Sequence, residues 1–402
     1  MLIVLPLLFL VSFAISSSIP AIRSGIKPKR SGLATRTAQL QKPLTASTCN
    51  DDIKPKVFII SMFDSEEEAW YNIPEFNILD QNLTIPGFSP LFPNAHCTYD
   101  GTICQMTTGE GEIHAAASMT ALWMSNCFDL RTTYFLIAGV GGVDPHIATT
   151  GSVTFARYAV QFDLQYEFSQ SQVPANASSG YYPQAAEYPD EDNPRDYPGE
   201  IYGTEAFELN DNLKKRAVAL ARRATLNDTS AAQTYRAKYP YAPANLPPTV
   251  VECDTGTSNN YFSGSVLGNA FAAYTKLLTN GSGTYCNTQQ EDNASLEALL
   301  RGHIAGKLDF SRIIIMRTAS DFDRAPPDES EVWHLLYARQ EGLGPSLRNL
   351  YLAGREVVGD VLREWEGVYK EGVRAENYVG DLLNSLGGEV GPDIGTEAIW
   401  IN

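Results

Sequence analysis

The stretch "IIIMRTASDFDR", residues 313–324, places carboxyl groups directly after a run of apolar residues. The apolar run has the pattern of a buried strand, and Asp321 and Asp323 follow it. Burying a carboxylate there costs several kcal/mol unless the group is paired with a cation or keeps its proton. Asp321 is therefore either a buried carboxyl that can act as an acid or a solvated aspartate that caps the next segment. The other polar residues of the stretch are Arg317, Ser320 and Arg324.

Glycine-rich or acidic clusters follow other predicted strands. They are "SMFDSEEEAW" (61–70), "TTGEGEIHAA" (107–116) and "AGVGGVDP" (138–145), while "TQQEDNASLEAL" (288–299) begins a predicted helix. Glycines in such turns let backbone N–H groups approach a ligand. The candidates for this backbone role are Gly109, Gly111, Gly139, Gly141 and Gly142. The clusters match neither the dinucleotide fingerprint nor the P-loop, so we expect no nucleotide cofactor.

Metal and serine-hydrolase chemistry have little support in the sequence. The five histidines show no HxxxH or HxH spacing, the cysteines show no CxxC, and no GxSxG elbow occurs. We therefore expect neither a metal nor another cofactor.

Strands that alternate with helices must position these clusters. Strands are predicted at 56–63, 134–143, 249–253 and 313–319, and helices at 205–224 and 264–278 and from 293. The pattern predicts an α/β fold with a mixed, mostly parallel central sheet flanked by helices, and sites at the carboxyl ends of strands. Residues 151–168 alternate like paired strands, residues 64–73 read as a helix start, and residues 331–386 read as helical.

The N-terminus predicts export. Residues 1–20 have the apolar core of a cleaved signal peptide, although without a basic start, and residues 21–55 read as a flexible leader or pro-segment. The ordered domain is expected over 56–402, with an irregular insertion near 168–248. No later apolar run is long enough to cross a membrane, so we expect no stable membrane insertion.

Composition agrees with a secreted glycoprotein. A formal charge of −17 disfavours nucleic acid and anionic membranes as partners. Cys97 and Cys104 are equidistant from an Asp100-Gly101 turn, so they can face each other across a hairpin and form a disulfide. Glycosylation sequons occur at Asn82, Asn176, Asn227, Asn280 and Asn293.

The order and spacing of five motifs resemble the purine nucleoside permease family of fungi and bacteria, which is distantly similar to the nucleoside phosphorylase and nucleosidase superfamily. The similarity runs from about Pro55 to the C-terminus. The motifs are "KVFIISMF", "TTGEGEIHAAASMTAL", "FLIAGVGGVDP", "QQEDNASLEAL" and "IIIMRTASDFDR". The resemblance implies a nucleoside phosphorylase-like fold, a purine nucleoside as ligand, and assembly into a homo-oligomer.

Asp321 matches the superfamily's general acid, which protonates N7 of a departing purine, and Ser320 matches the residue that positions it. Protonation lets an electron-rich base leave an oxocarbenium-like ribosyl cation. Burial would keep the proton on the carboxyl near neutral pH. A guanidinium from Arg317 or Arg324 pointing at Asp321 would lower its pKa and count against this role.

Sugar and base contacts are implied in the same way. Glu291 matches the ribose-binding glutamate, flanked by Gln290 and Asp292 where the superfamily has Met and Gly, although Glu291 also suits a helix N-cap. In "GTSNNYFSG" (256–264), Tyr261 and Phe262 are expected to stack on the base, and Asn259 or Asn260 is expected to recognise it through hydrogen bonds. Both aromatic residues are equally compatible with a place in the core. Asn293 lies inside the ribose motif, so we do not expect its sequon to be glycosylated.

The attacking nucleophile is inferred from charge. Phosphorolysis needs arginines around a phosphate dianion. The first loop instead carries acids, and Ile137-Ala138 occupies the second position where phosphorylases place an arginine. Water is therefore the favoured nucleophile, with Glu66 as the base that orients it.

Together these features predict a purine nucleosidase that is secreted or held in the cell wall. Alternating access needs several membrane-spanning helices, which the chain after its signal lacks. The rival hypotheses are a nucleoside-binding component of transmembrane transport without chemistry, and a phosphate-dependent phosphorylase.

Overall fold

A computed structural model describes residues 53–174, 177, 179–186, 197–388 and 394. The chain divides into Met1–Leu40 and Gln41–Asn402, and every described residue lies in the second unit. The predicted signal peptide and nearly all of the leader lie outside the described residues.

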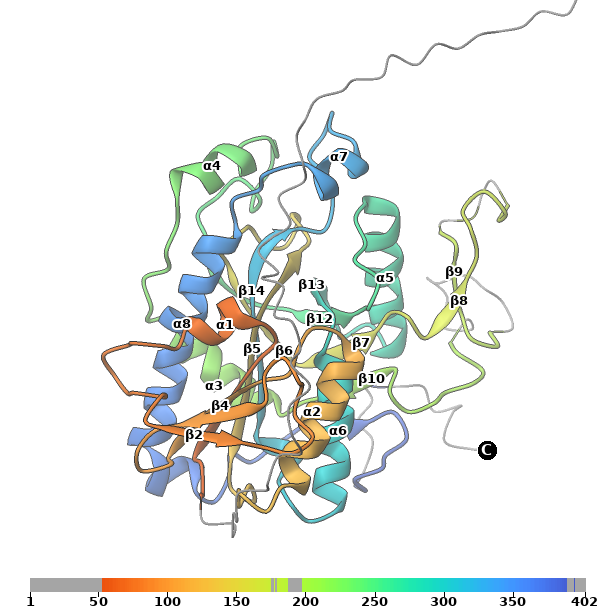
Figure 1. Cartoon of the computed structure of the whole chain (residues 1–402). Helices are drawn as coiled ribbons and strands as arrows, with labels where there is room; N and C mark the ends of the chain where they lie inside the picture. Colours follow the sequence, from red (N-terminus) through yellow and green to blue (C-terminus); the bar gives the residue numbers. More distant parts are fainter. Residues whose placement is uncertain (1–52, 175–176, 178, 187–196, 389–393, 395–402) are drawn as a thin grey trace, which may run out of the picture. The chain divides into compact units, whose positions relative to one another are not determined.

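The centre of the main sheet is parallel. In the part of the chain that is described, this sheet has thirteen strands. Strand β1 (Val57–Ser61) lies between β4 (Ile103–Thr107) and β5 (Tyr134–Val143), and β14 (Ile313–Phe322) pairs with β5 (Figure 1). All four pair in parallel, so their carboxyl ends lie at one edge of the sheet.

A second parallel group joins this centre through an antiparallel pair. Strand β12 (Asp254–Thr257) lies between β7 (Tyr158–Gln161) and β13 (Tyr285–Gln289). Strand β13 runs antiparallel to the end of β5, so the carboxyl ends of both meet. The remaining strands are β2 (Gln81–Thr84), β3 (Asn94–Cys97), β6 (Val153–Ala156), β10 (Ala206–Glu208), β11 (Val250–Glu252) and β15 (Gly380–Asp381), with β8 (Gln165–Glu167) and β9 (Tyr181–Pro183) in a separate hairpin.

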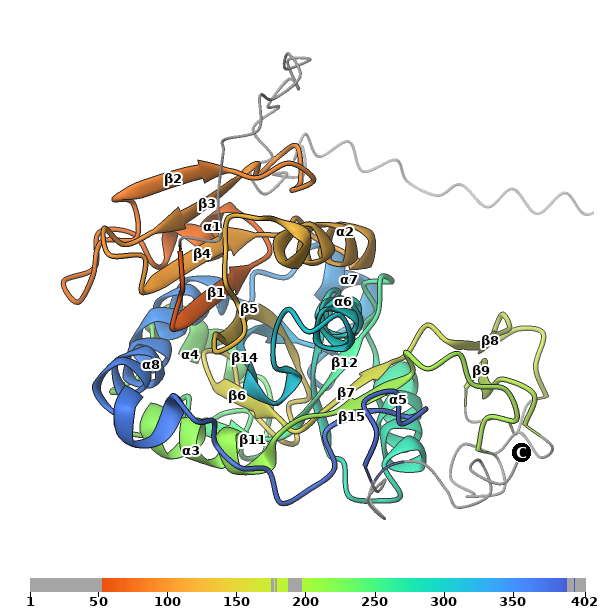
Figure 2. The ribbon, with the colours of Figure 1, turned by 90° about the horizontal axis from the view of Figure 1, so that it is seen from below.

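Helices cover both faces of strand β1 because its consecutive positions Val57–Ile60 are all apolar and buried. Phe58 and Ile60 of β1 pack with α2 (Glu112–Met124) and α6 (Asp292–Ile304). Val57 and Ile59 pack with α3 (Asp211–Ala221) and α8 (Leu343–Arg363) on the other face (Figure 2). Successive side chains of a strand point to opposite faces, so an all-apolar strand needs two helical layers. The other helices are α1 (Asp64–Glu68), α4 (Ser230–Arg236), α5 (Ser265–Leu278), α7 (Glu331–Leu336), the 3-10 turn Phe310–Arg312 and the π-helical turn Trp365–Tyr369.

The predicted α/β class with a mixed sheet is confirmed, while some element boundaries were wrong. The helix expected over 205–224 is strand β10 followed by α3, because Asn210 caps α3 by accepting a hydrogen bond from Leu213 N. Residues 377–386 contain β15 and turns instead of a helix. The helix expected over 64–73 ends early, at Glu68.

The two strands expected to pair within 151–168 do not pair with each other. Strand β6 pairs with β11 and β14, whereas β7 pairs with β10 and β12. The chain turns between them at Arg157, where the buried carboxylate of Asp254 accepts hydrogen bonds from Arg157 N and Tyr158 N. This side-chain contact from a distant strand redirects the backbone.

Two disulfides hold the described chain. Cys97–Cys104 bridges β3 and β4 in register, as the hairpin spacing predicted. Cys253–Cys286 ties the start of β12 to β13. Within the described ranges, no helix combines the length and apolar character that a membrane crossing requires.

Candidate functional site

A cavity lies where the carboxyl ends of β1, β5, β12, β13 and β14 meet. Ten of the predicted site residues line it: Glu66, Gly141, Gly142, Asn260, Tyr261, Phe262, Gln290, Glu291, Ser320 and Asp321. Residues far apart in sequence thus converge on one space, as the strand-end clusters predicted.

A β-bulge directs both Ser320 and Asp321 into this cavity. In the β14–β5 register, Ala319 pairs with Gly141 and Asp321 pairs with Gly142, so Ser320 is the extra residue. Consecutive residues of a regular strand point to opposite faces, and a bulge changes where side chains point. Because of the bulge, both side chains line the cavity.

Asp321 keeps its proton more readily than an ordinary aspartate. Burial raises its pKa, whereas hydrogen bonds from Ser320 and Tyr261 and the nearby His334 act in the opposite direction. Oδ1 lies 2.7 Å from Ser320 Oγ, and Oδ2 lies 2.8 Å from the hydroxyl of Tyr261. Ser320 Oγ also lies 3.2 Å from Gly141 O, and it has one hydrogen to donate. A protonated Asp321 can therefore donate to Ser320 while Ser320 donates to Gly141.

Neither nearby arginine points at Asp321. Arg324 binds Asp323 through two nitrogens, at 2.7 and 2.9 Å, and Asp144 at 3.0 Å. Burial raises the pKa of Asp323 to about 6. The feature that would have counted against Asp321 as an acid is thus absent from its described surroundings.

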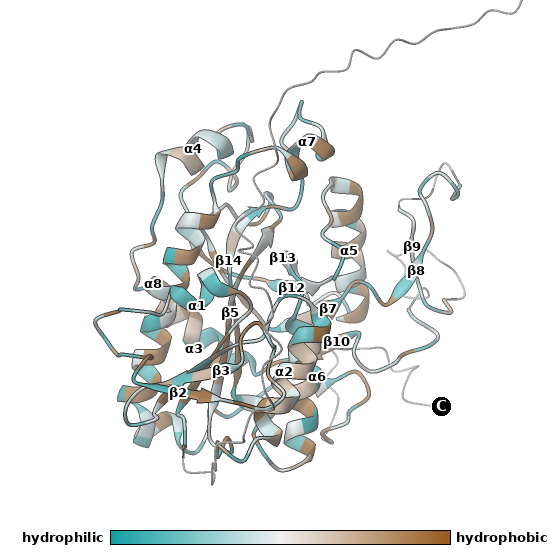
Figure 3. Ribbon diagram, in the orientation of Figure 1, coloured by the Kyte–Doolittle hydropathy of each residue, from teal (hydrophilic) through white to brown (hydrophobic). Residues whose placement is uncertain are grey.

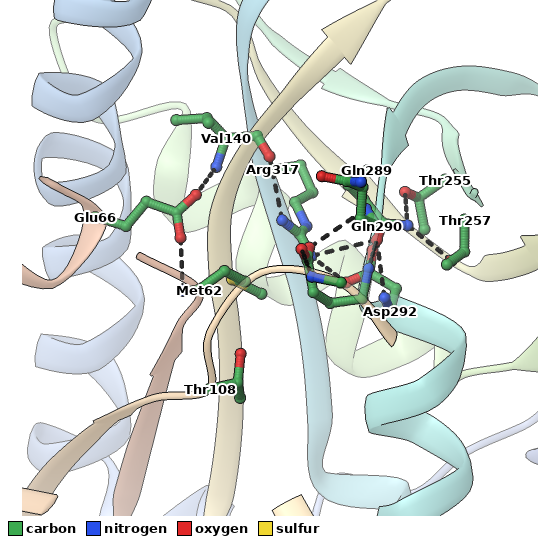
Figure 4. Close-up of polar contacts among 12 residues, drawn as sticks. Met62, Glu66, Thr108, Val140, Thr255, Thr257, Gln289, Gln290, Asp292 and Arg317 are labelled. Atoms are coloured by element: carbon green, nitrogen blue, oxygen red, sulfur yellow. Dashed lines mark hydrogen bonds and ion pairs between the residues drawn. The ribbon is translucent and has the colours of Figure 1, made fainter. Parts of the chain in front are cut away.

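Arg317 instead forms a buried ion cluster with Glu291 and Asp292 beside the cavity. Its Nη2 lies 2.6 Å from Oδ1 of Asp292 and 3.3 Å from Oε2 of Glu291 (Figure 4). Oε1 of Glu291 accepts a hydrogen bond of 2.9 Å from Gly111 N. Glu291 is fixed from two sides and faces the cavity, whereas Asp292 does not line it and serves as the counterion of Arg317.

Gln289 shapes the turn that presents Glu291. Its Oε1 accepts from Glu291 N at 2.6 Å and Asp292 N at 2.8 Å, which satisfies the first N–H groups of α6. Its Nε2 donates to Thr255 and Thr257 of β12. This role was not predicted from the sequence, because a glutamine is an uncommon capping residue.

Glu66 lies in the opposite wall of the cavity and is buried. Its two carboxylate oxygens accept hydrogen bonds from Met62 N at 2.7 Å and Val140 N at 2.6 Å (Figure 4). Burial raises the pKa of Glu66 to about 8, while Arg317 acts in the lowering direction. A carboxylate with this pKa can accept a proton near neutral pH.

Most of the five candidate glycines allow close packing of neighbouring residues and do not face the cavity. A Cβ at Gly139 would lie 2.5 Å from Nη1 of Arg317 and 2.8 Å from Oε1 of Glu66, and one at Gly141 would lie 2.6 Å from the Thr288 carbonyl. Gly109 and Gly111 adopt φ of 88° at the turn before α2. Of the five, only Gly141 and Gly142 line the cavity.

The predicted base-binding residues divide into three groups. Phe262 is buried in an aromatic cluster, with its ring centroid 4.8 Å from that of Phe271, so it is mainly a core residue that forms part of the wall. Tyr261 is 63% exposed and reaches Asp321 through its hydroxyl. Asn260 lines the cavity, but Asn259 does not, because its Oδ1 accepts from Glu112 N at the start of α2.

Other lining residues were not predicted to act in the site, among them Met62, Phe63, Glu110, Val140, Ser258, Thr288, Gln289, Arg317 and Asp323. The sequon residue Asn293 is buried, and its amide donates to Thr204 O. No group of three or more His, Cys, Asp or Glu residues suited to a metal occurs among the described residues.

Comparisons with known proteins agree on the family. A family model described as purine nucleoside permease matches residues 54–374. The chain is 45% identical over 351 residues to a purine nucleoside permease of Candida albicans, covering 86% of this chain and 84% of the relative. It is 39% identical over 315 residues to a probable purine nucleoside permease of Schizosaccharomyces pombe, covering 78% of this chain and 90% of the relative.

Solved structures show a weaker likeness. A 5′-methylthioadenosine/S-adenosylhomocysteine nucleosidase of Colwellia psychrerythraea, in complex with adenine, has a TM-score of 0.44 and 15% identity, with 76% of this chain and 95% of that chain covered. The futalosine hydrolase of Helicobacter pylori has a TM-score of 0.42 and 12% identity, with 77% and 98% covered. No functional property follows from a likeness of this size. The family match spans most of the chain, and both relatives are named for the same family, so the chain belongs to the purine nucleoside permease family.

Proposed function

We propose that the cavity binds a purine nucleoside and hydrolyses its N-glycosidic bond, with Asp321 as the general acid. The observation that carries this proposal is a cavity-facing carboxyl whose pKa is raised by burial and whose described contacts include no guanidinium. Purine nucleosides are the ligand class for which the family is named.

The proposed reaction uses three carboxyl groups in different states. Asp321 donates its proton to N7 of the purine, and the C1′–N9 bond breaks with its electron pair passing to the base. Glu291 accepts hydrogen bonds from the ribose hydroxyls. Water attacks C1′ of the oxocarbenium-like ribosyl cation while Glu66 takes a proton from that water. Proton exchange with solvent then restores Asp321 and Glu66, so the products are purine and ribose.

The charge of the cavity favours water over phosphate as the nucleophile. Among the described residues that line it, Arg317 is the only Lys or Arg. That guanidinium is already bound to Asp292, Glu291 and the Val140 carbonyl. A phosphate dianion would meet carboxyl groups without a free cation to bind it. The acidic lining residues are Glu66, Glu110, Glu291, Asp321 and Asp323.

We also propose that the protein works outside the cell or in its wall, where cleavage would supply base and ribose for uptake. Disulfides form and persist in oxidising compartments, and two occur among the described residues. The relatives' names favour a second candidate, in which the chain binds nucleosides and delivers them to a membrane partner without chemistry.

One assay separates these candidates. The purified chain is incubated with adenosine, guanosine or uridine, with and without phosphate, and the products are separated by chromatography. Free ribose and purine without added phosphate support the hydrolase. Ribose 1-phosphate that forms only with phosphate identifies a phosphorylase. Nucleoside binding without base release identifies a binding protein.

A further inference from the structure

The end of β14 is held from outside the cavity by residues that the proposed reaction does not use. Strand β6 pairs with β14 from Ile315 to Thr318, and the residues just before β6 continue this pairing to Ala319, whose N donates to Ser152 O at 2.9 Å and whose O accepts from Gly151 N at 2.7 Å. Beyond Ala319 this pairing no longer supports the edge opposite β5. This is the point where the Ser320 bulge begins. A bulge disrupts the ladder of hydrogen bonds, so the backbone around Asp321 needs other partners.

The loop between α7 and α8, together with the first turn of α8, provides several of those partners. The hydroxyl of Ser346 donates to the carbonyl of Ala319, directly before the bulge. Gly342 packs so closely on the bulge that a Cβ there would lie 2.3 Å from the carbonyl O of Ser320. The bulged backbone is thus enclosed on the side that faces away from β5.

Gln340 binds the peptide group that follows Asp321. Phe322 N donates to Oε1 of Gln340 at 2.8 Å, and Phe322 itself is buried. Nε2 of the fully buried His334 lies 3.0 Å from Phe322 O and 3.1 Å from Nε2 of Gln340. Whichever ring nitrogen carries the proton, His334 therefore binds either the Phe322 carbonyl or the Gln340 amide. Nδ1 of His334 lies 2.7 Å from the hydroxyl of Tyr235, which anchors the ring from α4.

We propose that Gln340, supported by His334, is a positioning residue that fixes the direction in which Asp321 points. The inference rests on the proposed role of Asp321. Gln340 is not among the lining residues of the cavity and touches Asp321 only through the backbone of Phe322. Without the side-chain oxygen of Gln340, Phe322 N loses its hydrogen-bond partner. The bulged backbone that carries Asp321 then shifts towards solvent. A displacement of about 1 Å at a reacting group can lower a rate by about a hundredfold.

Two variants and one control test this role in the full chain. Gln340→Ala removes the acceptor, and Gln340→Glu keeps an oxygen for Phe322 N. Asn210→Ala is the control, because Asn210 is a buried amide that binds Ser311 O just before the other end of β14. For Gln340→Ala we expect kcat per folded molecule to fall by about tenfold to a hundredfold, with KM changed by less than about twofold. Gln340→Glu should recover most of kcat, and Asn210→Ala should lose stability but keep kcat.

A second readout does not depend on turnover. The Asp321 carboxyl is titrated by carbon-13 NMR in wild type and in Gln340→Ala, and it is assigned by its absence in Asp321→Asn. The titratable groups that face it are Tyr261, His334 and Tyr235. Relaxation of the bulge would reduce burial, so the Asp321 pKa should fall towards its ordinary value in Gln340→Ala.

The outcomes separate this inference from the proposed function. Absence of base release by wild type would refute the proposed function, and the NMR titration would still decide the positioning role. An Asp321 titration that is the same in wild type and Gln340→Ala would overturn the inference even if the protein is an active nucleosidase. An unchanged kcat in Gln340→Ala would also overturn it.

Discussion

The hydroxyl of Tyr261 lies 2.8 Å from Oδ2 of Asp321 and that of Ser320 lies 2.7 Å from Oδ1, so both oxygens of this carboxyl have protein partners. Ser320 belongs to the same bulge as Asp321, whereas Tyr261 comes from the exposed loop between β12 and α5. In the proposed reaction, Tyr261 is therefore the partner that N7 of a purine would replace.

Replacing Tyr261 with Phe should make productive binding easier. The phenol competes with the base for Oδ2, and it also acts to lower the Asp321 pKa. We expect KM to fall by up to about tenfold, because a hydrogen bond between neutral groups contributes about 0.5–1.5 kcal/mol. The alkaline limb of the rate profile should move to higher pH. An increase in KM would show instead that the hydroxyl binds the substrate. Ser263→Ala is a matched control, because that hydroxyl in the same loop binds Glu331.

The rate should depend on pH in a bell shape. Glu66 must be ionised to accept a proton from water, and its pKa of about 8 means that the ionised fraction grows as pH rises through 8. Asp321 must be protonated, and the fraction in that form shrinks as the pH rises through its raised pKa, so the product of the two fractions falls at both extremes of pH. The profile of kcat/KM in wild type and Glu66→Gln provides the measurement. A rising limb that persists in Glu66→Gln would assign the base to another group.

Arg317 should be required for stability as well as for the site. Its guanidinium is buried against Asp292 and Glu291, so Arg317→Leu leaves carboxylates without a counterion. Loss of one partner of a buried pair costs about 3–5 kcal/mol. Urea denaturation should show this loss, whereas Arg301→Leu should cost about 1 kcal/mol or less, because Arg301 forms an exposed pair with Glu297. Equal effects of the two changes would contradict the importance of the buried cluster.

The disulfide Cys253–Cys286 should matter for binding, and Cys97–Cys104 should not. The first joins β12 to β13, the strands that lead to Tyr261 and Glu291, and it closes a longer segment of chain. Its replacement by two alanines should cost about 2–4 kcal/mol and raise KM. The same change at Cys97 and Cys104, in the hairpin of β3 and β4, should cost less and leave KM unchanged. A higher KM for the hairpin variant would argue against this assignment.

Much of the site could be predicted because the site residues of α/β proteins lie mainly at the carboxyl ends of strands. The apolar run before Asp321 and the glycines after β5 marked two strands whose carboxyl ends do meet in the structure. Side-chain direction could not be read in the same way. A one-residue bulge has no clear sequence signal, and Asn259 and Asp292 lie beside true cavity residues but face α2 and Arg317.

Contacts between distant segments also escaped prediction. Cys253 and Cys286 are separated by helix α5, and six cysteines alone permit many pairings. Gln340 was predicted to lie in a helix, within residues 331–386, whereas α7 ends at Leu336 and Gln340 follows it in the loop before α8. Figure 3 shows apolar residues along α7. Only the fold brings the amide of Gln340 to the backbone beside Asp321.

The most direct test compares base release and nucleoside binding in wild type and Asp321→Asn. The amide keeps the shape of the carboxyl but has no proton to donate to N7. Hydrolysis of adenosine or guanosine should fall by about a hundredfold to ten-thousandfold, the contribution typical of a general acid, while the Kd changes little. Base release by Asp321→Asn at the wild-type rate would contradict the account.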